Sequence, residues 1–291
     1  MQTKNSIIEE QNFLGTLKTI ATAYQEISVM KMKQTRDSIE HGRLFVAKLK
    51  KMFEALIVSF PSIKQSTKTP HVKKLAKVLI TANARFHGDI LRRIFNAFIA
   101  DEGKEGDILI VGKIGKDYLL QHGGDMKYTY YDVPDSNITV SDMRVLIHDL
   151  MQYETVLVYH AQFKTVVTQD IVTETIPSIY SLLEPTELPP KDEVVVETDP
   201  SAPPTPLYLF EPSGDVIADF MNDSVRASLT RQTLYETQLA RYASRIKAMD
   251  SLMHNIEDEE KTLKREKVKI IRTLNNKKQL ERISGILLWQ S

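Results

Sequence analysis

The sequence predicts a mixed α+β and α/β fold in which the two ends of the chain form a long antiparallel coiled coil. An α/β domain is inserted between these ends. No glycine or proline occurs from Asp215 to Ser284, so one helix about 105 Å long can form there. The N-terminal segment has a helical pattern as far as Phe60. Between the two ends, short β-branched apolar runs alternate with amphipathic segments, which is typical of an α/β sheet.

The C-terminal helix is predicted to begin near Asp215, whose carboxylate suits the positive end of a helix, and to stop at Gly285. Its apolar residues recur at spacings of three and four, which forms the seam of a coiled coil and requires a partner helix. The predicted seam residues are Leu239, Tyr242, Ile246, Met249, Met253 and Ile256.

The partner helix is predicted at the N-terminus, where Pro61 ends a long amphipathic segment. Its apolar residues repeat with the same alternation of three and four, and the two helices should pair in antiparallel orientation. If the C-terminal helix is the longer of the two, part of it must project beyond its partner or meet another protein. The predicted seam residues on this helix are Phe13, Leu17, Ile20, Tyr24 and Ile27.

The middle of the chain predicts a mostly parallel sheet with helices between its strands. Helices are expected at 87–103 and 139–151. The predicted strands are 77–82, 107–112, 128–133, 155–161 and 164–172, the last pairing with the strand before it.

The chain is predicted to have four parts. Seven prolines between Glu184 and Pro206 indicate an extended linker, with one short strand possible at Val194–Val196. The four parts are the N-terminal helix 1–60, the α/β domain 61–183, the linker 184–210 and the C-terminal helix 211–291.

Composition excludes several classes of function. The 38 basic and 38 acidic residues balance, which argues against a dominant nucleic-acid surface. The chain has no cysteine, so disulfides and thiolate metal sites are excluded. No apolar run reaches the roughly 18 residues that a membrane span needs, and the N-terminus has no apolar signal core. The sequence predicts a soluble intracellular protein.

A search for catalytic or cofactor-binding motifs finds none. Residues 111–117, "VGKIGKD", lack the spacing of a phosphate-binding loop and indicate a strand-to-helix turn. Residues 122–125, "HGGD", have no accompanying nucleophile elbow, and a surface turn is expected. His148 and His160 are interpreted as packing or surface residues. The acidic run 257–260 is interpreted as a solvated helix face, with a charged partner contact as the alternative. No cofactor or metal is expected.

Several motifs occur along the C-terminal helix. Residues 244–249 read "SRIKAM", Asn255 follows six residues after Met249, and "ISG" stands at 283–285. The segment 206–213, "PLYLFEPS", precedes this helix.

Two further motifs precede these in the chain, at 17–36, "LKTIATAYQEISVMKMKQTR", and at 107–119, "DILIVGKIGKDYL". Together, and in this order, the elements resemble the gamma subunit of F-type ATP synthase, the central shaft of a rotary motor. The resemblance runs along nearly the whole chain. It implies an antiparallel coiled coil with an inserted Rossmann-like α/β domain.

The sequence departs from that family in two places. After the first strand, "TANARFHGDILRR" keeps only Gly88 and the helix of the family pattern. Near the C-terminus, Arg272 stands where the family has Gln, and Asn276 and Lys278 replace Thr and Glu. The polar contact between the shaft tip and the beta subunit must therefore be rewired, or the chain is a divergent paralogue.

The resemblance implies a central rotor shaft that couples proton- or sodium-driven rotation of a membrane c-ring to conformational changes in the beta subunits. The implied partners are the alpha and beta subunits of the head, the epsilon subunit and the c-ring. The chain would be a non-catalytic, peripheral subunit at the cytoplasmic face of a bacterial inner membrane. The alternatives are a coiled-coil adaptor or a shaft of a non-synthase rotary ATPase. An enzyme using the α/β domain, or nucleic-acid binding by the basic residues 264–278, has weaker support.

The resemblance also implies which residues contact other subunits. Arg245 matches a family arginine that lies near the mobile helical lever of the beta subunit. Met30 matches a family methionine that lies close to this arginine on the N-terminal helix. Glu211 matches a family carboxylate in the same part of the shaft, its neck. Met30, Met32 and Met249 can instead be coiled-coil core residues. The predicted interaction residues are Met30, Lys31, Met32, Glu211, Arg245, Met249, Asn255 and Arg272.

Overall fold

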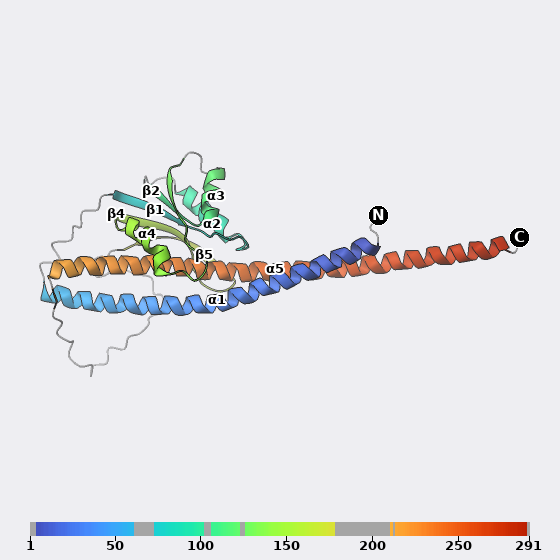
Figure 1. Ribbon diagram of the computed structural model, residues 1–291, viewed down its shortest axis with the longest axis horizontal. Helices are drawn as coiled ribbons and strands as arrows, with labels where there is room; N and C mark the ends of the chain where they lie inside the picture. Colours follow the sequence, from blue (N-terminus) through green and yellow to red (C-terminus); the bar gives the residue numbers. More distant parts are fainter. Residues whose placement is uncertain are drawn as a thin grey trace, which may run out of the picture.

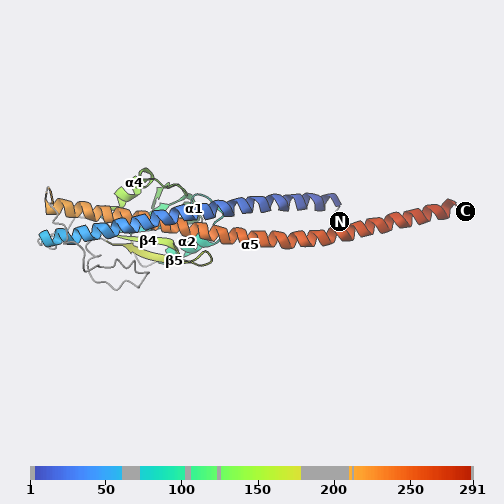
Figure 2. The same ribbon diagram turned by 90° about the horizontal axis from the view of Figure 1, so that it is seen from below.

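The computed structural model describes residues 4–60, 73–101, 106–122, 126–177, 210–211 and 213–289. Two long helices, α1 (Lys4–Ser59) and α5 (Gly214–Trp289), lie side by side and run in opposite directions (Figures 1 and 2). The α/β domain packs beside the half of this pair that holds the end of α1 and the start of α5. The far end of α5 projects well beyond the N-terminus. The predicted antiparallel coiled coil with an inserted domain is confirmed.

Five of the six predicted seam residues on α5 are buried, namely Leu239, Tyr242, Ile246, Met249 and Ile256. The sixth, Met253, is half-buried and its sulfur accepts a hydrogen bond from Thr22 of α1. Two apolar clusters lie along the helix pair, one near each end of α1. The first joins Leu49, Phe53 and Leu56 to Ala218, Met221 and Val225. The second joins Ile7 and Leu14 to Ile256 and Leu263.

The predicted seam on α1 is wrong except at Leu17, which is half-buried and packs against the cluster of Ile7 and Leu14. Phe13, Ile20 and Ile27 are exposed, and the ring of Tyr24 lies 5.8 Å from that of Phe86. One set of buried residues recurs at every seventh position and is mostly small or polar in the middle of the helix. Because bulky α5 side chains such as Tyr242 and Met249 fill the seam there, α1 needs only small residues opposite them. Ile39 and Phe53 are also buried, each four residues after a member of this set. The buried positions of the seven-residue repeat are Ile7, Leu14, Ala21, Ser28, Thr35, Gly42, Leu49 and Leu56.

The inserted domain is a five-stranded sheet in the order β3-β2-β1-β4-β5. The first four strands are parallel, as predicted, and β5 pairs antiparallel with β4 at one edge. The strands are β1 (Lys73–Ile80), β2 (Asp107–Val111), β3 (Tyr128–Tyr131), β4 (Tyr153–Phe163) and β5 (Gln169–Ile176). The last strand begins later than predicted because residues 164–167 form the bend of the hairpin.

Helices cover both faces of the sheet. Helix α4 (Val140–Leu150) packs on one face, while α2 (Ile90–Ala100) and α3 (Lys113–His122) pack on the other. Thr139 and Asp142 form a capping box that starts α4. Helix α5 contributes Leu234 to the core on the first face and Ala240 to the core on the second. The sheet is therefore attached to the long helix by apolar packing on both faces.

Two further predictions have different outcomes. Helix α5 continues through Gly285 to Trp289, so the predicted stop is wrong. A glycine ends a helix when the backbone turns left-handed there, and within a helix it costs only about 1 kcal/mol. The strand proposed at Val194–Val196, and the linker 184–210 except for Phe210, lie outside the described residues. The four-part division of the chain stays a prediction.

Candidate functional site

Two arginines of α5, one helical turn apart, bind the loop 81–89 that follows β1. Arg241 donates to the carbonyl of Thr81 and, at 2.9 Å, to the carboxylate of Asp135. Arg245 donates to the carbonyls of Arg85 and Phe86, each at 3.3 Å. Because the acceptors at Thr81, Arg85 and Phe86 belong to the backbone, the arginines fix the path of the loop relative to α5.

Asp135 links three elements through one carboxylate. Besides pairing with Arg241, it accepts hydrogen bonds from the backbone N–H groups of Asn83, at 3.0 Å, and Ala84, at 2.6 Å. Burial lowers the pKa of Arg241, and the charge of Asp135 opposes this shift. A buried charge is tolerated only with a partner of this kind. The loops after β1 and β3 are therefore tied to the same point on α5.

His87 lies between the two arginines as a neutral side chain. Its Nε2 accepts from Arg245 at 3.0 Å, and its carbonyl accepts from the Ser244 hydroxyl at 2.7 Å. Burial, together with the charges of Arg241 and Arg245, lowers the pKa of His87 to about 2. This imidazole therefore carries no charge near neutral pH. It acts as a hydrogen-bond acceptor in the junction, by which we mean the contacts of Arg241, Ser244 and Arg245 of α5 with the loop 81–89 and Asp135.

Gly88 allows the loop to approach α5. Its φ is +60°, and a Cβ placed there would lie 3.0 Å from the Ser244 hydroxyl oxygen. Phe86, two residues before Gly88, also has a positive φ, +69°, although it is not glycine. Its side chain is 62% exposed, with its ring 5.8 Å from that of Tyr24. Such backbone strain in an exposed aromatic residue is typical of a contact surface.

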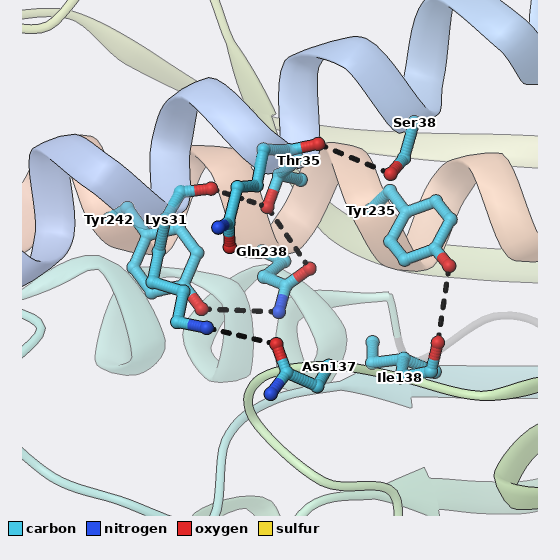
Figure 3. Close-up of a pocket in the computed structure, with 9 residues that line it drawn as sticks. Lys31, Thr35, Ser38, Asn137, Ile138, Tyr235, Gln238 and Tyr242 are labelled. Atoms are coloured by element: carbon cyan, nitrogen blue, oxygen red, sulfur yellow. Dashed lines mark hydrogen bonds between the residues drawn. The ribbon is translucent and has the colours of Figure 1, made fainter.

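A small polar pocket of about 140 Å³ lies where α1, α5 and the loop 132–139 meet (Figure 3). Lys31 donates to the side chain of Asn137 at 2.9 Å, and Gln238 donates to the carbonyl of Asp135 and to Tyr242. These hydrogen bonds join side chains of both helices to the loop 132–139, so the pocket serves as a joint between the helices and the domain. The lining residues are Lys31, Gln34, Thr35, Ser38, Asn137, Ile138, Tyr235, Gln238 and Tyr242.

The predicted interaction residues are not gathered at one place. Arg245 is 8% exposed and is bound to the loop, Lys31 lies in the pocket, and Met249 is buried in the seam. Met32 is half-buried. The other four, which are exposed, are Met30, Glu211, Asn255 and Arg272. The role of all eight in subunit contact stays a prediction.

Sequence reasoning missed Arg241, His87 and Asp135. One signal could have found the first of them, since Arg241 lies four residues before Arg245 and therefore on the same face of the helix. The contacts of His87 and Asp135 join segments more than a hundred residues apart. No spacing in the sequence reveals such contacts.

The described ranges contain no cluster of three or more His, Cys, Asp or Glu that could hold a metal ion. Within those same ranges, no helix has the length and apolar character of a membrane span. The contacts described form a rigid joint between the α/β domain and the pair of helices α1 and α5, and α5 extends beyond α1.

Comparison with known proteins gives consistent results. A family model described as ATP synthase matches residues 10–270. The ATP synthase gamma chain of Chloroherpeton thalassium is 23% identical, over 89% of this chain and 88% of that one. The gamma chain of Flavobacterium psychrophilum is 25% identical, over 82% and 80%.

Two solved structures share the fold. A chain of the Tetrahymena thermophila mitochondrial ATP synthase, from a structure of the central stalk and c-ring, gives a TM-score of 0.53 at 17% identity. It covers 80% of this chain and 98% of that chain. A chain of the Euglena gracilis mitochondrial ATP synthase gives a TM-score of 0.54 at 12% identity, covering 91% and 94%.

Proposed function

The chain belongs to the ATP synthase family, in the group of its gamma-chain relatives, and we propose that it is the central rotor shaft of an F-type ATP synthase. In this role it couples rotation of an ion-driven c-ring to conformational changes in the catalytic beta subunits. The observation that carries the proposal is the antiparallel helix pair with a domain fixed to one side and one helix projecting beyond the other.

A shaft must transmit torque without slipping, and the described contacts suit this task. Apolar clusters pack the seam near each end of α1, and Ala21, Ser28 and Thr35 are buried between them. Packed side chains cannot pass one another without unpacking. The α/β domain is bound to α5 through Arg241, Arg245 and Ser244. A force applied to the domain therefore reaches α5 directly.

The chemical reaction would take place in the partner subunits. A shaft changes their conformations because each of them contacts a different face of it, and this requires differential contacts only. The chain would thus be a non-catalytic subunit, peripheral to the membrane at its cytoplasmic face. Its partners would be the alpha and beta subunits, the epsilon subunit and the c-ring.

The eight predicted interaction residues take different roles within this proposal. Met30, Glu211, Asn255 and Arg272 are exposed and available for direct contact. Arg245 would act through the loop that it holds, because its guanidinium binds the carbonyls of Arg85 and Phe86. The exposed Phe86 would then be the part of that loop that meets a neighbouring subunit.

The test is reconstitution. The purified full chain is mixed with the alpha and beta subunits from the same source, and complex formation and ATPase rate are measured together. We expect one copy of the chain in each alpha–beta ring and a raised ATPase rate. Assembly without activation would favour a divergent paralogue that acts as an adaptor. The absence of any assembly would exclude the rotor role.

A further inference from the structure

The segment 83–89, here called the latch, is attached to α5 by polar contacts rather than by a share in the apolar core. His87 is its only buried residue, Asn83 is half-buried and the others are exposed. The two apolar clusters of the α/β domain include Ala82 before the latch and Ile90 after it, but none of the residues between them. A segment of this kind can separate from the rest of a protein without unpacking its core.

Both ring nitrogens of His87 are engaged, and each has a defined role. Nε2 lies 3.0 Å from a guanidinium nitrogen of Arg245, which can only donate, so Nε2 accepts. The proton of the neutral ring is therefore on Nδ1, which lies 3.4 Å from the carbonyl oxygen of Arg241. A second proton would have to bind Nε2, where it would face an N–H group of Arg245. The contact would then join two donors and would be lost.

The charges around His87 also oppose a second proton. Burial, together with the charges of Arg241 and Arg245 on α5, lowers its pKa from 6.5 to about 2. Asp135, in the loop 132–139, already pairs with Arg241 and binds two backbone N–H groups. Helix α1 contributes the ring of Tyr24, 5.8 Å from the guanidinium of Arg245. The charged residues of the latch itself, both exposed, are Arg85 and Asp89. The closed latch therefore requires a neutral imidazole, whereas a released latch would place that imidazole in water, where it binds a proton readily.

The closed latch also holds a strained residue. Phe86 has a φ of +69°, which a residue other than glycine rarely adopts. Arg245 maintains this conformation by donating to the carbonyls of Arg85 and Phe86, each at 3.3 Å. Release from α5 would let Phe86 return to an ordinary conformation. The hydrogen bonds of the junction thus hold the latch closed against its own backbone.

We propose that the latch is acid-sensitive: a proton on Nε2 of His87 releases residues 83–89 from α5 while the sheet and the helix pair stay folded. The device depends only on contacts within this chain, so it would operate whether or not the chain serves as a rotor. Release would also move Phe86 away from Tyr24, whose ring lies 5.8 Å from it. Acid would thus remove an exposed aromatic surface that the latch and α1 form together.

Amide hydrogen exchange of the purified full chain tests the latch. The amides of Asn83 and Ala84 report on it, because both donate to Asp135 in the closed state. The amides of Val78 and Val158, which lie opposite each other in the sheet, report on the core. The protection factor, which is the intrinsic exchange rate divided by the measured rate, is compared between about pH 8 and about pH 5.5. Over this range ordinary Asp and Glu side chains keep their charge.

In the wild type we expect the protection factors of Asn83 and Ala84 to fall about tenfold between these pH values, because only the released state takes up the proton. About 1 M urea should leave their exchange unchanged, since a local opening exposes little surface, but should speed exchange in the core. Protection that stays constant with pH would overturn the proposal. Acceleration of the latch amides by urea to the same degree as the core amides would overturn it too, because the latch would then open only in global unfolding.

Two single variants of the full chain assign the effect to one side chain. His87→Gln keeps a group that can accept from Arg245 but takes up no proton, so the protection factors of the latch amides should be equal at both pH values. In the matched control, the exposed His148 of α4 is replaced by glutamine, and the tenfold fall should remain. A fall that persists in His87→Gln, or one that disappears in His148→Gln, would exclude His87 as the group that releases the latch.

Discussion

Replacing Arg241 by methionine tests whether the junction on α5 holds the α/β domain in place. Methionine keeps much of the volume but removes the hydrogen bonds to Thr81 and Asp135. Charge-assisted bonds of this kind contribute roughly 1.5–3 kcal/mol each. Asp135 keeps its bonds from Asn83 and Ala84, so it is not left alone. We therefore expect a loss of about 3 kcal/mol, the lower end for a broken buried pair.

Urea unfolding followed by circular dichroism measures this loss, and the exchange of the Asn83 and Ala84 amides reports on the loop itself. In a chain of this size the melting temperature should fall by roughly 6–12 °C. Arg92→Met removes an exposed arginine from α2 and should change stability by less than about 0.5 kcal/mol. If Arg241→Met lost under about 1 kcal/mol and the loop amides exchanged as in the wild type, the junction would not hold the domain.

Two further substitutions test other parts of the structure. Because the pKa of His87 falls from 6.5 to about 2 on folding, only the unfolded state binds a proton between these values, and stability falls as the pH drops below 6.5. His87→Gln should lower the free energy of unfolding at pH 7 and remove its dependence on this imidazole. The difference in free energy of unfolding between wild type and variant should therefore shrink by about 2 kcal/mol between pH 7 and pH 5, measured by urea titration. A difference that stays constant over this range would contradict the neutral buried imidazole. Leu14 is 9% exposed and Phe13 61%, so Leu14→Ala should cost about 2 kcal/mol and Phe13→Ala less than about 0.5 kcal/mol. The opposite order in thermal melts would restore the seam predicted from sequence.

Most of the helices and strands could be predicted because they have a local signal, whereas α3 is not among the helices expected from the sequence. The long interval without glycine or proline marks α5, and the β-branched runs mark the parallel strands. The seam of α1 could not be predicted in this way. Its central residues are Ala21, Ser28 and Thr35, which hydrophobicity does not select. The larger residues Ile20 and Ile27 lie on the outside, where the proposed ring would cover them.

The junction was predicted only in part. Arg245 was chosen from the resemblance as a contact to another subunit, while the structure has its guanidinium bound to the loop 81–89 of its own chain. Asp135 and His87 contribute through contacts between segments that are far apart in the sequence. Their positions depend on how the sheet docks against α5. Such docking follows from the folded shape and has no periodic signal.

The distribution of contacts assigns different mechanical tasks to the two long helices. Helix α5 binds the domain from Arg226, which donates to the Tyr153 carbonyl at 2.8 Å, to Lys247, which reaches the Val167 carbonyl. These attachments span roughly 30 Å of the helix. Polar contacts of α1 with the domain include Lys31 to Asn137 and the guanidinium of Arg36 over Phe163. Torque on the domain would therefore enter α5 along this length, and α1 would act as a brace that keeps α5 from bending.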